Sequence, residues 1–123
     1  MFAERSSSGK HMICDIKNIK NTKSLNNVND LISLLKNICV EHNFDILQET
    51  SYEFKPMGCS ILFLLSESHI SIHTFPEKNH MSLDLYTCRE YNDNEAYNKI
   101  YKYIIEYLNA SSESNLQIID RYF

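Results

Sequence analysis

Three consecutive strand-like segments in the middle of the chain constrain the fold most. Cys59–Leu65 is a continuous apolar run, which is typical of a buried central strand. Ile70–Phe75 and Met81–Cys88 alternate apolar and polar side chains, as strands with one buried face do. The turn signal Lys55-Pro56-Met57-Gly58 precedes them. The middle of the chain therefore predicts a sheet.

Two helices are predicted on either side of these strands. Apolar residues recur at helical spacing between Leu25 and His42, with Asn27 or Asn29 as a capping residue. The second helix is expected over Asp93–Asn109, where Asn92 and Glu95 come close to a capping box. Further strands are expected at His11–Ile19, Asp45–Phe54 and Asn115–Phe123.

The resulting order, β-α-β-β-β-β-α-β, determines the expected fold class. Two helices can cover only one face of such a sheet, which predicts an α+β two-layer sandwich. The sheet is expected to be mostly antiparallel, with both helices packed on one face. The 123 residues suit a single domain over 1–123, and burial in an oligomer would supplement its modest core.

Composition excludes several classes of function. The formal net charge is −4 and the lysines are spread out, which argues against a nucleic-acid-binding surface. No apolar run is long enough to span a membrane, and MFAERSSSGK lacks a signal-peptide core, so a cytoplasmic location is expected. The four cysteines form no CxxC pair and are expected to be free thiols.

Chemically reactive side chains concentrate in Ser66–Glu77, which reads SESHISIHTFPE, and in DLYTC at Asp84–Cys88. One interpretation is a polar strand edge, and another is a Ser-His or Cys-His nucleophile, although no GxSxG loop is present. A metal site would use His69, His73, His80 and Cys88. In a strand, however, His69 and His73 lie about 13 Å apart, too far for one zinc ion.

ESHISIHTFPE followed by DLYTC resembles the signature of bacterial-type S-adenosylmethionine decarboxylase proenzymes, which usually reads ESHLSIHTWPE and then D-x-[FY]-T-C. Two further segments resemble the same family. These are Phe54-Lys55-Pro56-Met57-Gly58-Cys59-Ser60 and Gly9-Lys10-His11 with Asp15 after it. The resemblance covers most of the chain and is strongest between Phe54 and Cys88.

The resemblance implies self-cleavage between Glu67 and Ser68, giving a β chain of residues 1–67 and an α chain of residues 68–123. Ser68 would become a covalent pyruvoyl group, which accepts the electrons of decarboxylation through a Schiff base with the substrate amine. Pyridoxal phosphate, the usual alternative, needs a phosphate site, and the sequence has no Gly-rich phosphate loop. The implied product is decarboxylated S-adenosylmethionine, the aminopropyl donor for spermidine synthesis.

Individual roles follow from the same resemblance. His73 would remove the Ser68 α-proton during processing, Ser60 would support the acyl shift, and Cys88 would reprotonate the product carbon. Phe54 would stack on the adenine ring, with Phe75 beside it, and Glu77 would accept hydrogen bonds from the ribose hydroxyls. Active enzymes of the family are at least homodimers of αβ protomers, with sites near the subunit interface. No metal is implied, and His69 is interpreted as structural.

The chain departs from the family pattern around the expected substrate pocket. Arg89-Glu90 stand where a Gly is usual, Ile61 replaces a second Gly, and Phe75 replaces Trp. These departures keep two alternatives open. One is a pyruvoyl-dependent decarboxylase of arginine or ornithine, and the other is a non-catalytic homologue that regulates a partner.

Overall fold

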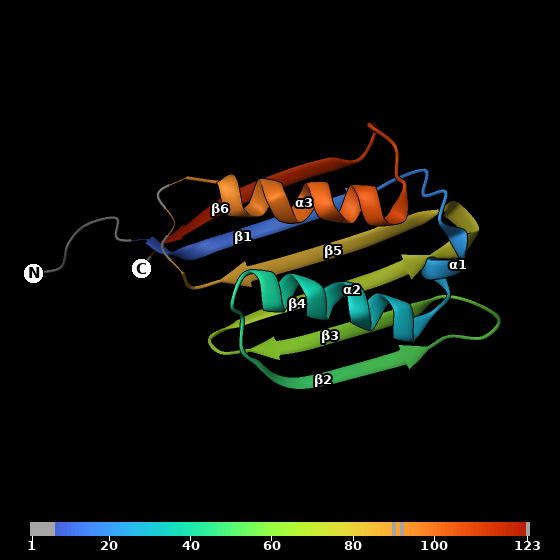
Figure 1. Ribbon diagram of the computed structural model, residues 1–123, viewed down its shortest axis with the longest axis horizontal. Coiled ribbons are helices and arrows are strands. Elements are labelled where there is room, and N and C mark those ends of the chain that lie inside the picture. Colours follow the sequence, from blue (N-terminus) through green and yellow to red (C-terminus); the bar gives the residue numbers. More distant parts are fainter. Residues whose placement is uncertain (1–6, 90, 92, 123) are drawn as a thin grey trace, which may run out of the picture.

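The computed structural model describes residues 7–89, 91 and 93–122. The described residues form one six-stranded sheet and a layer of helices (Figure 1). The elements are β1 (Ser7–Ile16), α1 (Thr22–Leu25), α2 (Val28–Glu41), β2 (Ile46–Glu53), β3 (Cys59–Leu65), β4 (Ser68–Phe75), the 3₁₀ helix η1 (Pro76–Lys78), β5 (His80–Thr87), α3 (Glu95–Leu108) and β6 (Asn115–Tyr122). The strand order is β2-β3-β4-β5-β1-β6, and all neighbouring strands pair antiparallel.

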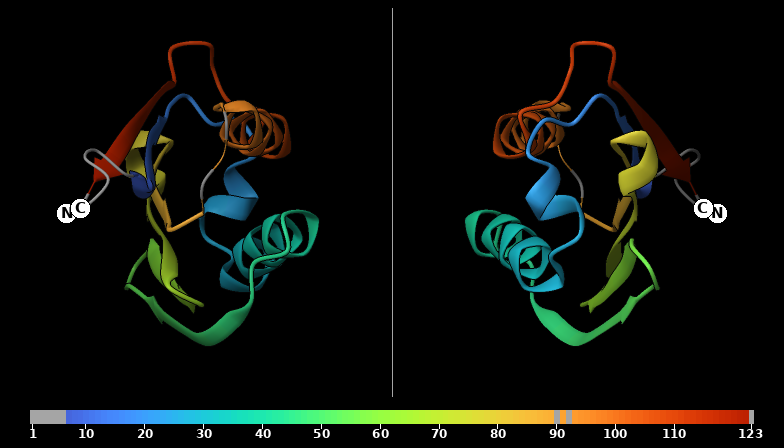
Figure 2. Two further views of the ribbon diagram at one scale, coloured as in Figure 1. Left: turned by 90° about the vertical axis from the view of Figure 1, so that its left-hand side faces the viewer. Right: turned by 90° about the vertical axis from the view of Figure 1, so that its right-hand side faces the viewer.

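The helices cover one face of the sheet and leave the other face open (Figure 2). The expected α+β two-layer architecture is therefore confirmed. The core lies between the layers, where α2 contributes Leu31, Leu34, Leu35 and Ile38, and α3 contributes Tyr97, Ile100, Ile104 and Leu108. Each such side chain stabilises the fold by roughly 1.5–3 kcal/mol when it leaves water.

The first predicted helix was wrong in its start and its continuity. Leu25 belongs to the separate short helix α1, and α2 begins at Val28. Asn27 lies between the two helices and is the N-cap of α2, because its side chain accepts a hydrogen bond from the Asp30 N–H. The second helix, α3, begins at Glu95 rather than at Asp93. The Asp93 side chain accepts a hydrogen bond from the Glu95 N–H. The predicted partner Asn92 lies outside the described residues.

The continuous apolar run of β3 predicted a strand buried on both faces, but the structure buries only one face. Its inward residues pack under the helices, but Leu62 and Leu64 are 45% and 49% exposed on the open face. Ile61 points inward and is fully buried, so this departure from the family pattern lies in the core rather than beside a pocket. Strand β4 begins at Ser68, two residues earlier than predicted.

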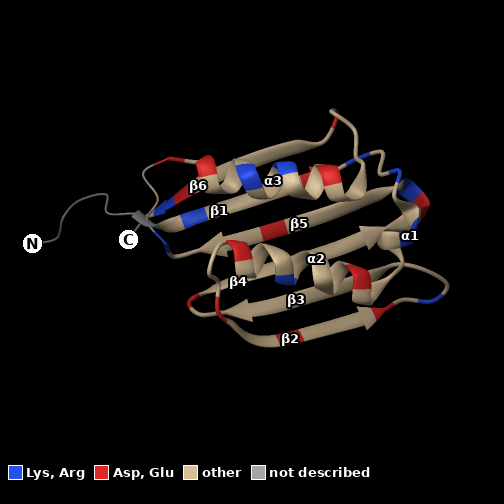
Figure 3. Cartoon of the chain, viewed as in Figure 1, with Lys and Arg blue, Asp and Glu red and all other residues tan. Residues whose placement is uncertain are grey.

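Charged positions are interspersed along the helices that face the viewer in Figure 3. Both helices carry residues of both signs, and Lys36 of α2 pairs with Glu49 of β2 at 3.4 Å. Within residues 7–89, 91 and 93–122, no helix is long and apolar enough to cross a membrane.

Candidate active site

The eight predicted site residues lie at opposite ends of the sheet. One group, called the Ser68 end, lies where β3 ends, β4 begins and β5 ends, and consists of Glu67, Ser68 and Cys88. The other five lie where β2 ends, β3 begins and β4 ends, and this group is called the His73 end: Phe54, Ser60, His73, Phe75 and Glu77. The Ser68 end is on the left in Figure 1 and the His73 end is on the right.

One strand, β4, separates Ser68 from His73. The two residues are five positions apart in an extended strand, which corresponds to about 17 Å at about 3.3 Å per residue. An odd spacing also puts them on opposite faces, with Ser68 inward and His73 on the open face. Within one chain, the structure therefore does not bring the His73 imidazole to Ser68.

At the Ser68 end, the bond predicted to be cut lies in a tight turn. Glu67 has a φ of 58°, which places it in the left-handed region. A residue other than Gly is disfavoured there by about 1–2 kcal/mol. The backbone on the amino side of Ser68 is therefore strained, and Ser68 itself is only 8% exposed at the start of β4.

Cys88 approaches this turn from β5. Its N–H donates to Ser68 Oγ at 3.3 Å, and its thiol donates to the Glu67 carboxylate at 3.3 Å. Of the four cysteines, Cys88 alone is partly exposed, and all four are free. Burial raises the pKa of Cys14 to about 12 and that of Cys39 to about 11. Cys88 is consequently the thiol available for proton transfer.

At the His73 end, Ser60 and His73 form a short hydrogen bond. They face each other in the β3–β4 register, and Ser60 Oγ lies 2.6 Å from His73 Nδ1. Both side chains belong to the open face. The hydroxyl fixes the orientation of the imidazole, so the pair suits a positioned base.

The predicted binding residues surround that pair. Phe54 and Phe75 are 49% and 39% exposed, Phe54 packs on Tyr52 with 4.9 Å between ring centroids, and Phe75 packs on His80 at 5.8 Å. Glu77 lies in η1, directly after Phe75 and Pro76. Beside Phe75 is a hollow of about 500 Å³, whose other lining residues are Lys17, Asn18, Lys78, His80, Ser82 and Glu113.

The turn that carries Phe54 is held by the start of the helical layer. Phe54 N–H donates to the Gly58 carbonyl, and the Gly58 N–H donates to Asn26 Oδ1 at 2.9 Å. Gly58 has a φ of 94°, a conformation that side chains disfavour. The sequence did not indicate a role for Asn26, because its hydrogen bond joins segments that are 32 residues apart.

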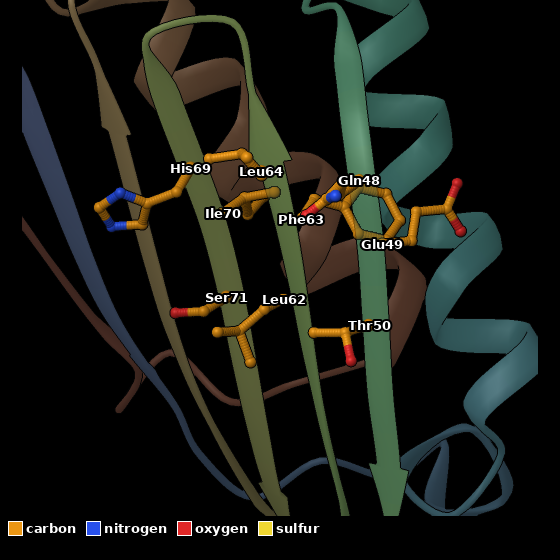
Figure 4. A pocket seen from close by; sticks show the side chains of 9 residues that line it. All are labelled: Gln48, Glu49, Thr50, Leu62, Phe63, Leu64, His69, Ile70 and Ser71. Atoms are coloured by element: carbon orange, nitrogen blue, oxygen red, sulfur yellow. The ribbon is translucent and has the colours of Figure 1, made fainter.

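A second hollow of about 370 Å³ lies over β2, β3 and β4, between the two ends of the sheet (Figure 4). Its open-face lining is formed by Gln48, Thr50, Leu62, Leu64, His69 and Ser71. The hollow follows from the exposure of Leu62 and Leu64, so the prediction of a fully buried β3 missed it. Beside it, the His69 ring lies 6.1 Å from that of His11 and 6.0 Å from that of Tyr86.

No group of three or more His, Cys, Asp or Glu side chains among the described residues is arranged to hold a metal ion. His69 and His73 share the open face of β4, but a whole strand segment separates them.

Comparison with known proteins shows which family the chain is similar to. The model of the S-adenosylmethionine decarboxylase family matches residues 10–122. The S-adenosylmethionine decarboxylase proenzyme of Clostridium botulinum is 34% identical over 101 residues, covering 82% of this chain and 84% of that protein. The proenzyme of Bacillus velezensis is 30% identical over 110 residues, covering 89% and 83%. The crystal structure of the adenosylmethionine decarboxylase from Aquifex aeolicus superimposes with a TM-score of 0.82 at 30% identity, covering 96% of this chain and 93% of that one.

Proposed function

The chain belongs to the S-adenosylmethionine decarboxylase family, and we propose on that basis that it decarboxylates S-adenosylmethionine with a pyruvoyl group made from its own Ser68. The product is decarboxylated S-adenosylmethionine, the aminopropyl donor for spermidine synthesis. The observation that carries the proposal is the Ser68 end, where a strained Glu67 precedes a nearly buried Ser68 and Cys88 contacts both.

Self-cleavage between Glu67 and Ser68 yields chains 1–67 and 68–123. The Ser68 hydroxyl attacks the Glu67 carbonyl and the Glu67–Ser68 C–N bond breaks, which converts the peptide to an ester and relieves the left-handed strain at Glu67. β-Elimination then releases the Glu67 carboxylate and leaves dehydroalanine at position 68, which water hydrolyses to the pyruvoyl group and ammonia. The pyruvoyl group, once formed, supplies the carbonyl that accepts the electrons of decarboxylation. Cys88 then delivers a proton to the product carbon, because its thiol is the accessible one beside Ser68.

The separation of the two ends supports a homodimer of αβ protomers. His73 removes the Ser68 α-proton in this scheme, yet about 17 Å of strand lies between them in one chain. A two-fold axis perpendicular to the strands, with the open faces packed together, brings the Ser68 end of one protomer to the His73 end of its partner. The exposed Leu62 and Leu64 and the hollow beside them give this face the apolar surface that such packing needs.

Substrate binding is assigned to the aromatic and acidic residues of the His73 end. Phe54 and Phe75 offer exposed ring faces for the adenine and for the cationic sulfonium. Glu77 accepts hydrogen bonds from the ribose hydroxyls. The four free cysteines support a cytoplasmic location.

Arginine or ornithine as substrate, and a non-catalytic regulatory role, are not favoured. The relatives from Clostridium botulinum and Bacillus velezensis are named for S-adenosylmethionine, and Ser68, His73 and Cys88 are all present. A regulator without chemistry has no need for this set of side chains.

Intact-mass measurement of the purified protein beside Ser68→Ala tests the proposal. Cleavage gives two chains, and chain 68–123 is lighter than a chain with an N-terminal serine by the mass of ammonia. Ser68→Ala stays uncut because it lacks the hydroxyl nucleophile. Carbon dioxide release from S-adenosylmethionine, arginine and ornithine then identifies the substrate. A wild-type chain that stays at full mass contradicts self-processing, and release from arginine or ornithine alone contradicts the substrate.

A further inference from the structure

Cys88 stands just beyond the last residue of β5, where strand pairing no longer fixes the backbone. Its contacts with Ser68 Oγ and the Glu67 carboxylate are both 3.3 Å, so they depend on where residues 87–89 are held. A proton donor tolerates little displacement, since a misplacement of about 1 Å lowers a rate by about 100-fold. Something other than the sheet must therefore hold Cys88.

On the helix side, the anchor is Thr87. Its Oγ1 lies 2.6 Å from the Tyr97 hydroxyl of α3, and both side chains are fully buried. Burial raises the pKa of Tyr97 to about 12, in keeping with a side chain enclosed in the core. The residue before Cys88 is thus tied to the core.

On the β1 side, the backbone of Gly9 presses directly on this segment. A Cβ at Gly9 would lie 1.9 Å from the Thr87 carbonyl oxygen and 2.8 Å from Cys88 Cα. Gly9 also has a φ of 126°, which other residues adopt only with strain. Any side chain at position 9 therefore pushes Cys88 away from its place.

On the α2 side, Arg89 reaches across to the helix end. Its guanidinium donates through Nη1 to the His42 carbonyl and through Nη2 to the Asn43 carbonyl. It also stacks over the Phe44 ring at 4.6 Å from the centroid. Carbonyls at a helix C-terminus lack intrahelical partners and carry partial negative charge, so a planar cation fits there well.

We propose that Gly9 and Arg89 are positioning residues that hold the Cys88 thiol beside Glu67 and Ser68. Gly9 sets how closely β1 approaches Cys88, and Arg89 fixes the following residue to the end of α2. Neither residue touches the scissile bond, so both act through Cys88. The catalytic consequence rests on the proposed decarboxylase function, whereas the position of the thiol can be measured without it.

Alkylation of Cys88 by iodoacetamide, followed by intact mass, reports on the thiol directly. The parent is Ser68→Ala, which keeps the chain uncut, and Cys14, Cys39 and Cys59 are buried and react slowly. Arg89→Gly and Gly9→Ala are expected to raise the Cys88 rate by about tenfold, because the thiol loses its carboxylate partner. Arg89→Lys falls between, since one ammonium cannot hold two carbonyls in the same way.

Lys36→Ala is the matched control. It removes a cation that joins α2 to the sheet through Glu49, away from Cys88, and is expected to leave the alkylation rate unchanged. In processed protein without the Ser68→Ala change, Arg89→Gly is expected to lower kcat by about 10- to 100-fold with KM within about twofold. If losing any cation that joins α2 to the rest of the fold were enough to lower kcat, Lys36→Ala would lower it by the same factor.

Unchanged alkylation in a folded Arg89→Gly chain overturns the proposal, and so does an equal rise in Lys36→Ala. If Gly9→Ala fails to fold, Arg89→Gly decides the question alone. If the wild-type chain neither cleaves nor decarboxylates, the proposed function fails, while the alkylation rates still test whether Gly9 and Arg89 hold Cys88.

Discussion

The two ends of β4 differ in what holds their reactive groups. At the His73 end, Ser60 and His73 sit opposite each other in the register of two paired strands, so the sheet itself positions them. At the Ser68 end, Glu67 lies in a turn and Cys88 follows a strand, so neither is held by strand pairing. The proposed base is built into a rigid ladder, whereas the bond proposed to be cut and the proposed proton donor lie outside the strand pairing.

Helix α2 joins these ends, with one terminus at each. Just before its N-terminus, Asn26 holds the turn that carries Phe54. At its C-terminus, the His42 carbonyl holds Arg89 beside Cys88. In the proposed homodimer, one chain therefore carries two half-sites, each supported at its own terminus of α2, and completing a site requires the other end of a second copy.

Mixed dimers test that sharing and carry the strongest predicted effect. Ser68→Ala and His73→Ala chains, co-expressed with different tags, form mixed dimers in which one site has both Ser68 and His73. We expect the His73→Ala chain to be cut in these dimers and the Ser68→Ala chain to stay intact, as measured by intact mass. Each variant expressed alone is the control. An uncut His73→Ala chain in verified mixed dimers would contradict a shared site.

Charge on the open face is expected to separate the protomers. Leu64→Glu places a carboxylate in the proposed interface, where an unpaired charge costs several kcal/mol. We expect a monomer by light scattering and a loss of processing of at least about 100-fold. Val40→Glu is the matched control, because Val40 is 78% exposed on α2. A monomeric Leu64→Glu chain that cleaves at the wild-type rate would show that one protomer suffices.

Within the His73 end, the two partners are expected to contribute unequally. His73→Ala removes the proposed base and is expected to slow processing by about 100-fold or more. Ser60→Ala removes only a hydrogen bond to the imidazole and is expected to slow it by about tenfold. Time courses of cleavage after denaturation and refolding give both rates. Equal effects would mean that Ser60 acts on the reacting atoms rather than through His73.

Local patterns in the sequence predicted the elements well, because strands and helices have different periods. The alternation in β4 and β5, the Asn27 cap and the two-layer fold all follow from such patterns. Spacing alone does not predict the Ser60–His73 pair, because 13 residues separate the two. The resemblance to the family singled out both residues, and the structure places their side chains in contact.

The sequence was least informative where distance along the chain and distance in space diverge. Ser68 and His73 appear adjacent in the motif, yet an extended strand turns five residues into about 17 Å. Arg89 appeared to alter a turn near a pocket, but it contacts the end of α2, 46 and 47 residues away. Such contacts depend on how the layers pack, which periodicity does not encode.

The weakest predicted effect is a difference between the two termini of α2 in how the stability of the fold depends on pH. At the C-terminus, burial chiefly lowers the pKa of His42 from its ordinary 6.5, and the Lys99 and Arg89 cations lower it further against the raising effect of Glu41. The unfolded chain therefore binds more protons there, so stability is lost as pH falls through 6.5. At the N-terminus, hydrogen bonds from Ser24 and Tyr107 lower the pKa of Asp30 from 3.8, so its contribution is lost only below that value.

His42→Asn is accordingly expected to reduce the fall in Tm between pH 7.5 and 5.0 by up to about 2 °C, allowing for solvent screening of a partly exposed group. Tyr107→Phe removes a hydrogen bond to Asp30 and is expected to leave that fall unchanged, because its effect on Asp30 lies at lower pH. Thermal melts in matched buffers measure both. If His42→Asn melts with the wild-type pH dependence across this range, His42 does not cause the fall in Tm. The two termini of α2 then do not differ in their sensitivity to acid.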